Sequence, residues 1–167
     1  MNKVLVTGGA GFIGSHLVDA LVGKGVEVVI LDDLSTGKRE NIAHHTSGVT
    51  FIEGDVSDAS RVAQAAEGVD VIFHLAAIAS VQKSIEEPLM VHRVNTQGTL
   101  AVFDAAKKLG VKKVVYASSS AVYGDVPGLP KDETMPCCPK TPYGLQKMIG
   151  EGYAKLYGEL HQLSSVG

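Results

Sequence analysis

A tyrosine and a lysine in the last third of the chain have the spacing of an acid–base pair. Tyr143 and Lys147 follow Thr141 and Pro142, which are typical of the start of a helix. Side chains four residues apart lie on one face of a helix, so the Lys147 ammonium would stabilise a tyrosinate at Tyr143. Tyr143 would then act as a base toward a substrate hydroxyl that Ser119 holds in place. In isolation, this spacing describes any pair of residues on a helix surface.

Three consecutive hydroxyl residues, Ser118 to Ser120, come directly after an apolar segment. Proteins of the α/β class place their chemistry at the carboxyl ends of strands, so a serine cluster at this point favours a functional site. Either Ser119 or Ser120 could supply the hydroxyl that binds the substrate.

A glycine-rich turn near the amino terminus predicts a dinucleotide-binding site. β-forming residues precede it, and a helical pattern follows with these residues on its predicted apolar face: Ile13, Leu17, Ala20 and Leu21. Gly8 and Gly11 would let a pyrophosphate approach the backbone, and Gly14 would let the helix pack closely on the strand. The helix start, at Phe12 and Ile13, would direct N–H groups and a partial positive charge toward the phosphates. The alternative is a flexible surface turn.

Two aspartates follow the next apolar run. Asp32 lies roughly 20 residues beyond the glycines, where a carboxylate can accept hydrogen bonds from the ribose hydroxyls of adenosine. With Asp33 beside it, a 2′-phosphate would meet two carboxylates. The pair therefore predicts NAD rather than NADP, and the alternative is an ordinary aspartate at a strand end.

Polar residues further along could extend this cofactor site. Ser35, Thr36 and Gly37 could bind ribose or phosphate, or they could form the cap of the next helix. Asp55 and Val56 could flank the adenine ring. Alternatively, Asp55 or the aspartate three residues beyond it caps the helix that follows.

Small residues end the fourth apolar run. Leu75, Ala76 and Ala77 leave room for a flat ring at a strand end. His74, directly before them, is predicted to be a structural histidine rather than a base. Asn95 lies within a long helical pattern, where it either faces solvent or bridges to backbone or water near the cofactor.

Five short apolar runs supply the scaffold for these residues. They lack polar alternation, which is typical of strands buried on both faces of a parallel sheet: Val4–Val6, Val28–Leu31, Thr50–Ile52, Val71–Phe73 and Val114–Tyr116. Helical patterns lie between them. The sequence therefore predicts one NAD-binding domain, residues 1–167, with a doubly wound Rossmann-type α/β fold, strand order 3-2-1-4-5 and helices on both faces.

Composition excludes several classes of partner. The formal net charge is −3 and no basic stripe is present, so nucleic acid is not an expected partner. No apolar run reaches the ~18 residues that cross a membrane, and no signal-peptide pattern precedes the first strand. Cys137 and Cys138 have neither zinc nor disulfide spacing, so we expect no metal site and a cytoplasmic location with reduced thiols.

Taken together, the motifs resemble the extended short-chain dehydrogenase/reductases, and among these the NAD-dependent nucleotide-sugar epimerase/dehydratase family. The resemblance covers essentially the whole chain and depends on these segments: Thr7–Gly14, Asp32–Gly37, Gly54–Val56, His74–Ala77, Asn95–Thr99, Ser118–Gly124, and Tyr143 with Lys147. It implies NAD as cofactor, a nucleotide-diphosphate sugar as substrate, and Ser119, Tyr143 and Lys147 as catalytic residues. Because the family's catalytic hydroxyl lies three residues before Val-Tyr-Gly, it selects Ser119, with Ser120 second.

The resemblance also implies a reaction. Dehydratases of the family carry Asp-Glu after the catalytic hydroxyl, whereas Ser120 and Ala121 stand here, which favours 4-epimerisation of a UDP-hexose. Tyr143 would take the proton of the sugar 4-hydroxyl while hydride passes to NAD. Hydride would then return to the other face of the 4-keto sugar. A dehydratase or a reductase is the alternative.

Family members are about twice as long as this chain. Their second half adds a sixth strand, further nicotinamide contacts and a domain that binds the nucleotide diphosphate, and Leu163–Gly167 resembles the start of that strand. The resemblance thus implies the amino-terminal half of an epimerase, with the substrate domain absent. The alternative is a non-catalytic NAD-binding module left by truncation.

Two predicted helices, residues 89–109 and 143–160, are candidates for self-association. The first has a wide apolar face, and the second carries four glycines: Gly144, Gly150, Gly152 and Gly158. Each glycine costs up to about 1 kcal/mol in a helix interior, so the glycines indicate close approach of a partner or of the chain's own sheet. The family pairs these helices in a dimer, so the resemblance implies a homodimer. We expect the sheet edge beside Val114–Tyr116 to be open.

Overall fold

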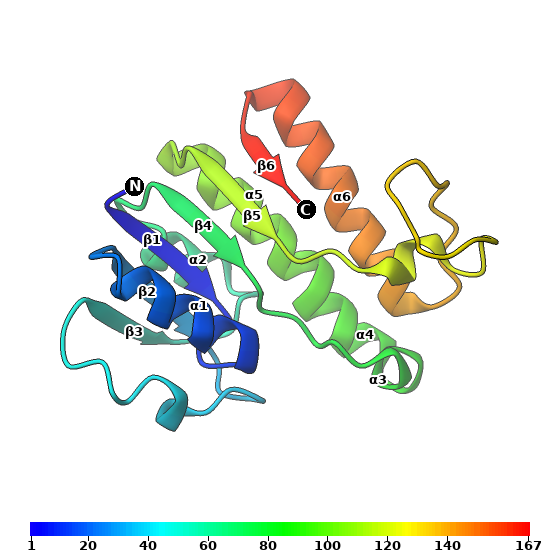
Figure 1. Ribbon diagram of the computed structural model, residues 1–167. Helices are drawn as coiled ribbons and strands as arrows, with labels where there is room; N and C mark the ends of the chain where they lie inside the picture. Colours follow the sequence, from blue (N-terminus) through cyan, green and yellow to red (C-terminus); the bar gives the residue numbers. More distant parts are fainter.

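A computed structural model describes all residues, 1–167, and contains one sheet of six parallel strands in the order β3-β2-β1-β4-β5-β6 (Figure 1). The predicted order of the first five strands and the doubly wound Rossmann-type fold are confirmed. The strand bounds are β1 Lys3–Thr7, β2 Glu27–Asp32, β3 Val49–Glu53, β4 Val71–His74, β5 Lys113–Tyr116 and β6 Ser164–Val166. β6 pairs with the edge of β5, so the expectation of an open edge there was wrong.

Helices cover both faces of this sheet (Figure 1). Their bounds are α1 Phe12–Val22, α2 Ala59–Ala65, α3 Val81–Glu86, α4 Pro88–His92, α5 Gly98–Leu109 and α6 Pro142–His161, with single turns η1 Arg39–Asn41, η2 Arg93–Gln97 and η3 Ser120–Tyr123. Strand residues alternate between two cores: Val4 and Val6 pack with α1, and Leu5 packs with α2 and α5. None of the helices combines the length and hydropathy needed to cross a bilayer.

The register of the parallel strands aligns their carboxyl ends along one edge of the sheet. Thr7 of β1 lies opposite Leu31 of β2 and His74 of β4, and His74 lies opposite Tyr116 of β5. The segments that follow these residues carry most of the predicted site. The fold therefore gathers them along one end of the sheet.

The apolar face predicted for α1 was only half right: Leu21 is buried and Leu17 packs against the core. Ile13 is 70% exposed and Ala20 is also exposed, whereas the buried residues are Gly14, Ser15, Val18 and Leu21. A Cβ at Gly14 would meet backbone atoms of Gly8 and Gly9. Close contact with the turn thus sets which side of α1 faces the sheet.

The helix predicted over residues 89–109 is divided into α4, a π-helical turn η2 and α5. The wide apolar face has an explanation within the chain, because α5 packs against the sheet and also contacts α2 and α6. Gly98 lies against Val56, and Ala101 is buried in the core. These two positions face inward and are therefore unavailable to a partner.

The helix predicted over residues 143–160 is confirmed as α6, and most of its glycines also have neighbours within the chain. A Cβ at Gly144 would lie 2.6 Å from the Ala121 oxygen, and one at Gly150 would lie 3.5 Å from Thr99. Gly158 is next to the Leu163 carbonyl, whereas nothing lies within 4 Å of a Cβ at Gly152. Packing within the chain requires glycine only at Gly144, because 3.5 Å at Gly150 and 3.7 Å at Gly158 are ordinary van der Waals distances.

Candidate functional site: a nucleotide cleft at the carboxyl ends of the strands

A cleft of about 760 Å³ runs along the carboxyl ends of the central strands. Thirteen of the predicted cofactor residues line it: Gly8, Gly11, Phe12, Ile13, Gly14, Asp32, Asp33, Ser35, Thr36, Val56, Leu75, Ala76 and Ala77. Gly37, Asp55, Asn95, Tyr143 and Lys147 lie outside its lining, and so does Ser119. The cleft also includes residues that the sequence did not indicate, among them Lys83, Met90 and Arg93.

The glycine turn is shaped by close backbone contacts. Gly8 has a φ of +72°, which favours glycine, and a Cβ there would lie 2.8 Å from the Ala76 nitrogen. The Gly11 N–H donates to the Gly8 carbonyl over 3.1 Å and closes the turn. α1 starts without a side-chain cap and without an acidic residue in its first turn, so the Phe12 and Ile13 N–H groups remain available to an anion.

Asp32 anchors the neighbouring side of the cleft. Its Oδ2 accepts the Ala10 N–H over 2.9 Å, and its Oδ1 accepts the Leu34 N–H over 2.9 Å. Asp32 as a whole is only 7% exposed, yet it is one of the residues that line the cleft. Gly37 packs against the Asp32 carboxylate so closely that a Cβ there would lie 2.8 Å from Oδ1. Each oxygen keeps a free lone pair that can accept a ribose hydroxyl.

Asp55 belongs to the support of the cleft. Its Oδ1 accepts the Ser57 N–H over 2.8 Å, and its Oδ2 pairs with Arg93 Nη1 over 2.7 Å. Asp58 caps α2 by accepting the Ser60 N–H over 2.9 Å, so the capping alternative is correct for Asp58. The ion pair with Asp55 holds the Arg93 guanidinium, and both Arg93 and Val56 line the cleft.

His74 is the centre of a buried chain of hydrogen bonds. The Thr99 hydroxyl donates to the Asn95 carbonyl over 2.6 Å, so it must accept from Nε2–H of His74, 3.0 Å away. Nδ1 then accepts from the Thr7 hydroxyl over 2.8 Å, and that oxygen accepts the Ala76 N–H over 3.2 Å. Every member is satisfied, which gives His74 the structural role predicted for it.

Asn95 holds the loop that forms one wall of the cleft. Its side chain is 3% exposed, accepts the Ile78 N–H over 2.8 Å, and donates to the Ile78 carbonyl over 3.0 Å and to Gln146 over 3.1 Å. The backbone-bridging alternative is therefore the correct one. Asn95 lies in the π-helical turn, and such turns are frequent at functional sites.

The three predicted catalytic residues lie on two segments in contact, Ser119 between β5 and η3, and Tyr143 with Lys147 at the start of α6. Lys147 donates to the Ala117 carbonyl over 2.8 Å, and Ala117 lines the cleft. The Lys147 nitrogen lies 5.9 Å from the ring centre of Tyr143. Ser119 caps the turn η3 through the Ala121 N–H over 3.2 Å, and η3 packs against α6.

Electrostatics set Lys147 and His74 apart from ordinary surface groups. Burial lowers the pKa of Lys147 to about 8. Burial, and secondarily the charge of Lys147, lowers the pKa of His74 to about 3. Lys147 therefore stays mostly cationic at neutral pH, whereas His74 stays neutral. Lys147 is the one that can stabilise a negative oxygen at the neighbouring tyrosine.

The three serines differ in what they contact. Ser118 donates to Glu151 of α6 over 2.5 Å, which orients it away from the other two. Ser119 is half-buried against η3, and Ser120 is exposed. The choice between Ser119 and Ser120 stays a prediction.

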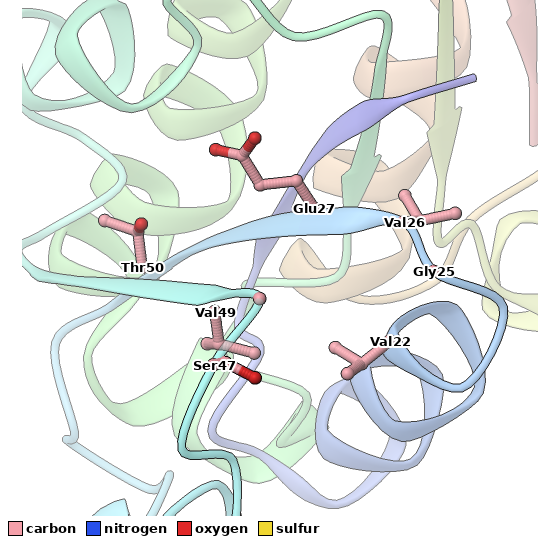
Figure 2. A pocket seen from close by; sticks show the side chains of 8 residues that line it. Val22, Gly25, Val26, Glu27, Ser47, Val49 and Thr50 are labelled. Atoms are coloured by element: carbon pink, nitrogen blue, oxygen red, sulfur yellow. The ribbon is translucent and has the colours of Figure 1, made fainter.

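A second hollow lies at the opposite end of the sheet, beside the amino ends of β2 and β3. Figure 2 shows Glu27 and Thr50 on one side of these strands, and Val22, Ser47 and Val49 on the other. Glu27 is its only charged side chain, and it pairs with Lys3 over 3.7 Å. The hollow's other polar side chains are the hydroxyls of Ser47 and Thr50.

A glycine-turn cleft at the strand ends, with a tyrosine and a lysine one helical turn apart beside it, defines a Rossmann-type protein of the short-chain dehydrogenase/reductase class. Comparison with known proteins narrows the class. Residues 4–167 match the family model described as NAD dependent epimerase/dehydratase family, and the chain belongs to this family.

Individual relatives agree with this family. A UDP-glucose 4-epimerase of Mycolicibacterium smegmatis is 45% identical over 165 residues, which are 96% of this chain and 53% of that protein. The structure of a UDP-N-acetylglucosamine 4-epimerase from Methanobrevibacter ruminantium, in complex with UDP-N-acetylmuramic acid, superposes with a TM-score of 0.93 at 42% identity and covers 98% of this chain and 53% of that one. The NAD complex of the Thermus thermophilus UDP-glucose 4-epimerase gives 0.90 at 44%, with coverages of 98% and 53%. The chain spans about half the length of the relatives it matches.

Proposed function

We propose that the cleft binds NAD and that the chain is the cofactor-binding half of a UDP-hexose 4-epimerase. The glycine turn carries the proposal, because its uncapped helix start and the contact between Gly8 and Ala76 leave backbone at the point where a pyrophosphate would lie. Asp32 would accept the ribose hydroxyls, and Val56 would contact the adenine. When bound, NAD supplies the hydride acceptor for oxidation at the sugar.

The proton chemistry belongs to the residues at the start of α6. Tyr143 would accept the proton of the sugar 4-hydroxyl, and Ser119 would hold that hydroxyl. The Lys147 ammonium, tied to the Ala117 carbonyl, would stabilise the negative charge that develops on the tyrosine oxygen. The other contacts to the substrate, and the choice of sugar, would depend on the part of the relatives that this chain does not match.

Epimerisation is favoured over dehydration by the turn η3. Ser120 and Ala121 occupy the positions where a dehydratase of this family would carry its acid and base. Glu151 is the carboxylate that contacts this serine cluster, and its hydrogen bond to Ser118 occupies it there. The turn therefore offers a hydroxyl to position the substrate but no acid to expel water.

Calorimetry with NAD and NADP tests the cofactor assignment. We expect NAD to bind preferentially, and more weakly than it binds the full-length relatives. Preference for NADP, or binding of neither, would overturn the assignment. Assays with UDP-glucose and UDP-N-acetylglucosamine test the reaction, with low turnover expected from this half because remote binding contacts normally position the reacting centre.

Tyr143→Phe tests the catalytic assignment. Any epimerase turnover should be almost abolished, since the phenyl ring cannot accept a proton, while NAD binding persists. Unchanged turnover would remove Tyr143 from the mechanism. A further assay adds the second half of a relative as a separate polypeptide. NAD binding without turnover in this assay too would favour the alternative, a non-catalytic NAD-binding module.

We propose further that the chain forms a homodimer through α4, α5 and α6, as the resemblance implies. α6 exposes three leucines on one side of the helix, two of them one turn apart near its end: Leu145 is 45% exposed, Leu156 48% and Leu160 71%. Leu89 of α4 is 86% exposed. Burying such a row against its symmetry copy is a common way to stabilise a dimer. A cytoplasmic location stays a prediction.

A further inference from the structure

Two histidines and an aspartate meet on the surface away from the cleft. Asp19 belongs to α1, whereas His44 and His45 lie between η1 and β3. The Nε2 atoms of His44 and His45 are 2.9 and 2.8 Å from the same oxygen, Asp19 Oδ1. One ligand atom from each residue lies within 4.8 Å of the other two.

Two neighbouring side chains converge on one carboxylate oxygen. His44 lies in the turn that follows η1, and the rings of His44 and His45 have centroids 4.1 Å apart. A carboxylate oxygen accepts, so each Nε2–H donates to Asp19 Oδ1 and the two N–H groups point at the same atom.

We propose that Asp19, His44 and His45 form a binding site for a divalent first-row transition metal, of which zinc is the representative. Two imidazole nitrogens and a carboxylate oxygen are ligands that zinc prefers, and three protein ligands leave positions for water. The metal replaces both Nε2 hydrogens, which move to Nδ1 or to solvent. With metal–ligand distances of about 2.0–2.2 Å in a tetrahedral site, each Nε2 needs to move away from Asp19 Oδ1 by about half an ångström.

Such a metal would join two elements that carry the cleft. α1 supplies the glycine turn at its start, and the segment that contains His44 and His45 also includes Ser35 and Thr36. The segment is already held at Asn41, whose side chain donates to the Ala10 carbonyl over 2.8 Å. A second attachment at Asp19 would stabilise the folded state against local opening.

Zinc titration against a chromophoric chelator tests the site in a background of Cys137→Ser and Cys138→Ser. The two exposed thiols would otherwise compete for the metal. We expect one equivalent to bind, with at least tenfold weaker binding in Asp19→Asn and in His44→Gln. His92→Gln is the matched control, because His92 is exposed and outside the cluster. It should bind as the background does.

Thermal unfolding gives an independent readout. Zinc should raise the melting temperature of the background and of His92→Gln, and should leave that of His44→Gln unchanged. His44 suits this test because its side chain is 57% exposed, so the variant should fold normally. Absence of stoichiometric zinc binding would overturn the proposal. So would binding that survives both Asp19→Asn and His44→Gln, since the metal would then lie elsewhere.

Discussion

Burial of His74 in its hydrogen-bond chain should lower the stability of the folded protein in acid. The pKa of His74 is about 3 in the folded protein, against an ordinary value of 6.5. The unfolded state therefore binds one more proton between these values, and the folded state loses stability as pH falls through that window. The slope contributed by this one proton approaches about 1.4 kcal/mol per pH unit.

Urea unfolding across the upper half of the window measures this effect. His74→Gln cannot titrate, so its free energy of unfolding should fall less steeply with decreasing pH than that of the wild type. His92→Gln removes an exposed histidine and should retain the wild-type slope. Equal slopes in the wild type and in His74→Gln would show that His74 titrates normally.

Asp32→Ala tests the ribose contact. Loss of a charge-assisted hydrogen bond should weaken NAD binding by roughly 1–3 kcal/mol in calorimetry. Asp125→Ala removes an exposed aspartate elsewhere and should leave the affinity unchanged. Because Asp32 also accepts the Ala10 and Leu34 N–H groups, a thermal melt should accompany the measurement. Unaltered affinity in folded Asp32→Ala would contradict the assignment.

Residues at fixed offsets from a turn were predictable from the sequence. Gly8, Gly14 and Asp32 could be found because strand, turn and helix are contiguous, so spacing in sequence determines spacing in space. Lys83 and Arg93 could not be found in this way. They reach the cleft through the packing of α3 and η2 against distant segments, which no local pattern encodes.

At the scale of the element, two glycines make a matched pair. Gly14→Ala places a Cβ against Gly8 and Gly9 backbone atoms that cannot move aside, so it should destabilise the fold by about 1–3 kcal/mol. Gly152→Ala meets nothing within 4 Å and should stabilise α6 by up to about 1 kcal/mol. Chemical denaturation measures both. A neutral Gly14→Ala would contradict the close packing of α1 on its turn.

The phase of a helix was harder to predict than its existence. For α1, apolar periodicity selected Ile13 and Ala20, whereas contact of Gly14 with the turn rotated both outward. For α5, the wide apolar face has three neighbours, the sheet, α2 and α6. Periodicity reports that a face is buried and does not report what buries it.

At the scale of the whole molecule, sedimentation velocity across a concentration series tests the homodimer. We expect reversible dimerisation, and Leu156→Glu or Leu160→Glu should shift it toward monomer by placing a charge in the apolar row. Leu129→Glu, in a loop where the side chain is 87% exposed, is the control. A monomer at all concentrations would reject the dimer, and a polydisperse ladder would indicate association through a strand edge.

The order of the sheet was the most predictable property of the molecule, because right-handed crossovers leave few topologies for alternating strands and helices. The pairing of β6 with β5 was not predicted. β6 has only three residues, and its register is set by the end of α6, where Gln162 adopts a φ of +56°. Glutamine rarely adopts this left-handed conformation, so the sequence gives little indication of the turn.

The π-helical turn is also equivalent to one residue inserted into an α-helix. A π turn completes one rotation with one more residue than an α turn, so the helix on either side of it keeps its phase. Removing one residue from Arg93–Gln97 would therefore restore a continuous helix with Leu89 still on its present side of the axis. The deletion would instead disturb the hydrogen bonds of Asn95 to Ile78, which hold the loop at the cleft wall. A change of one codon here would thus reshape the cleft wall and leave the outer surface of the helix as it is.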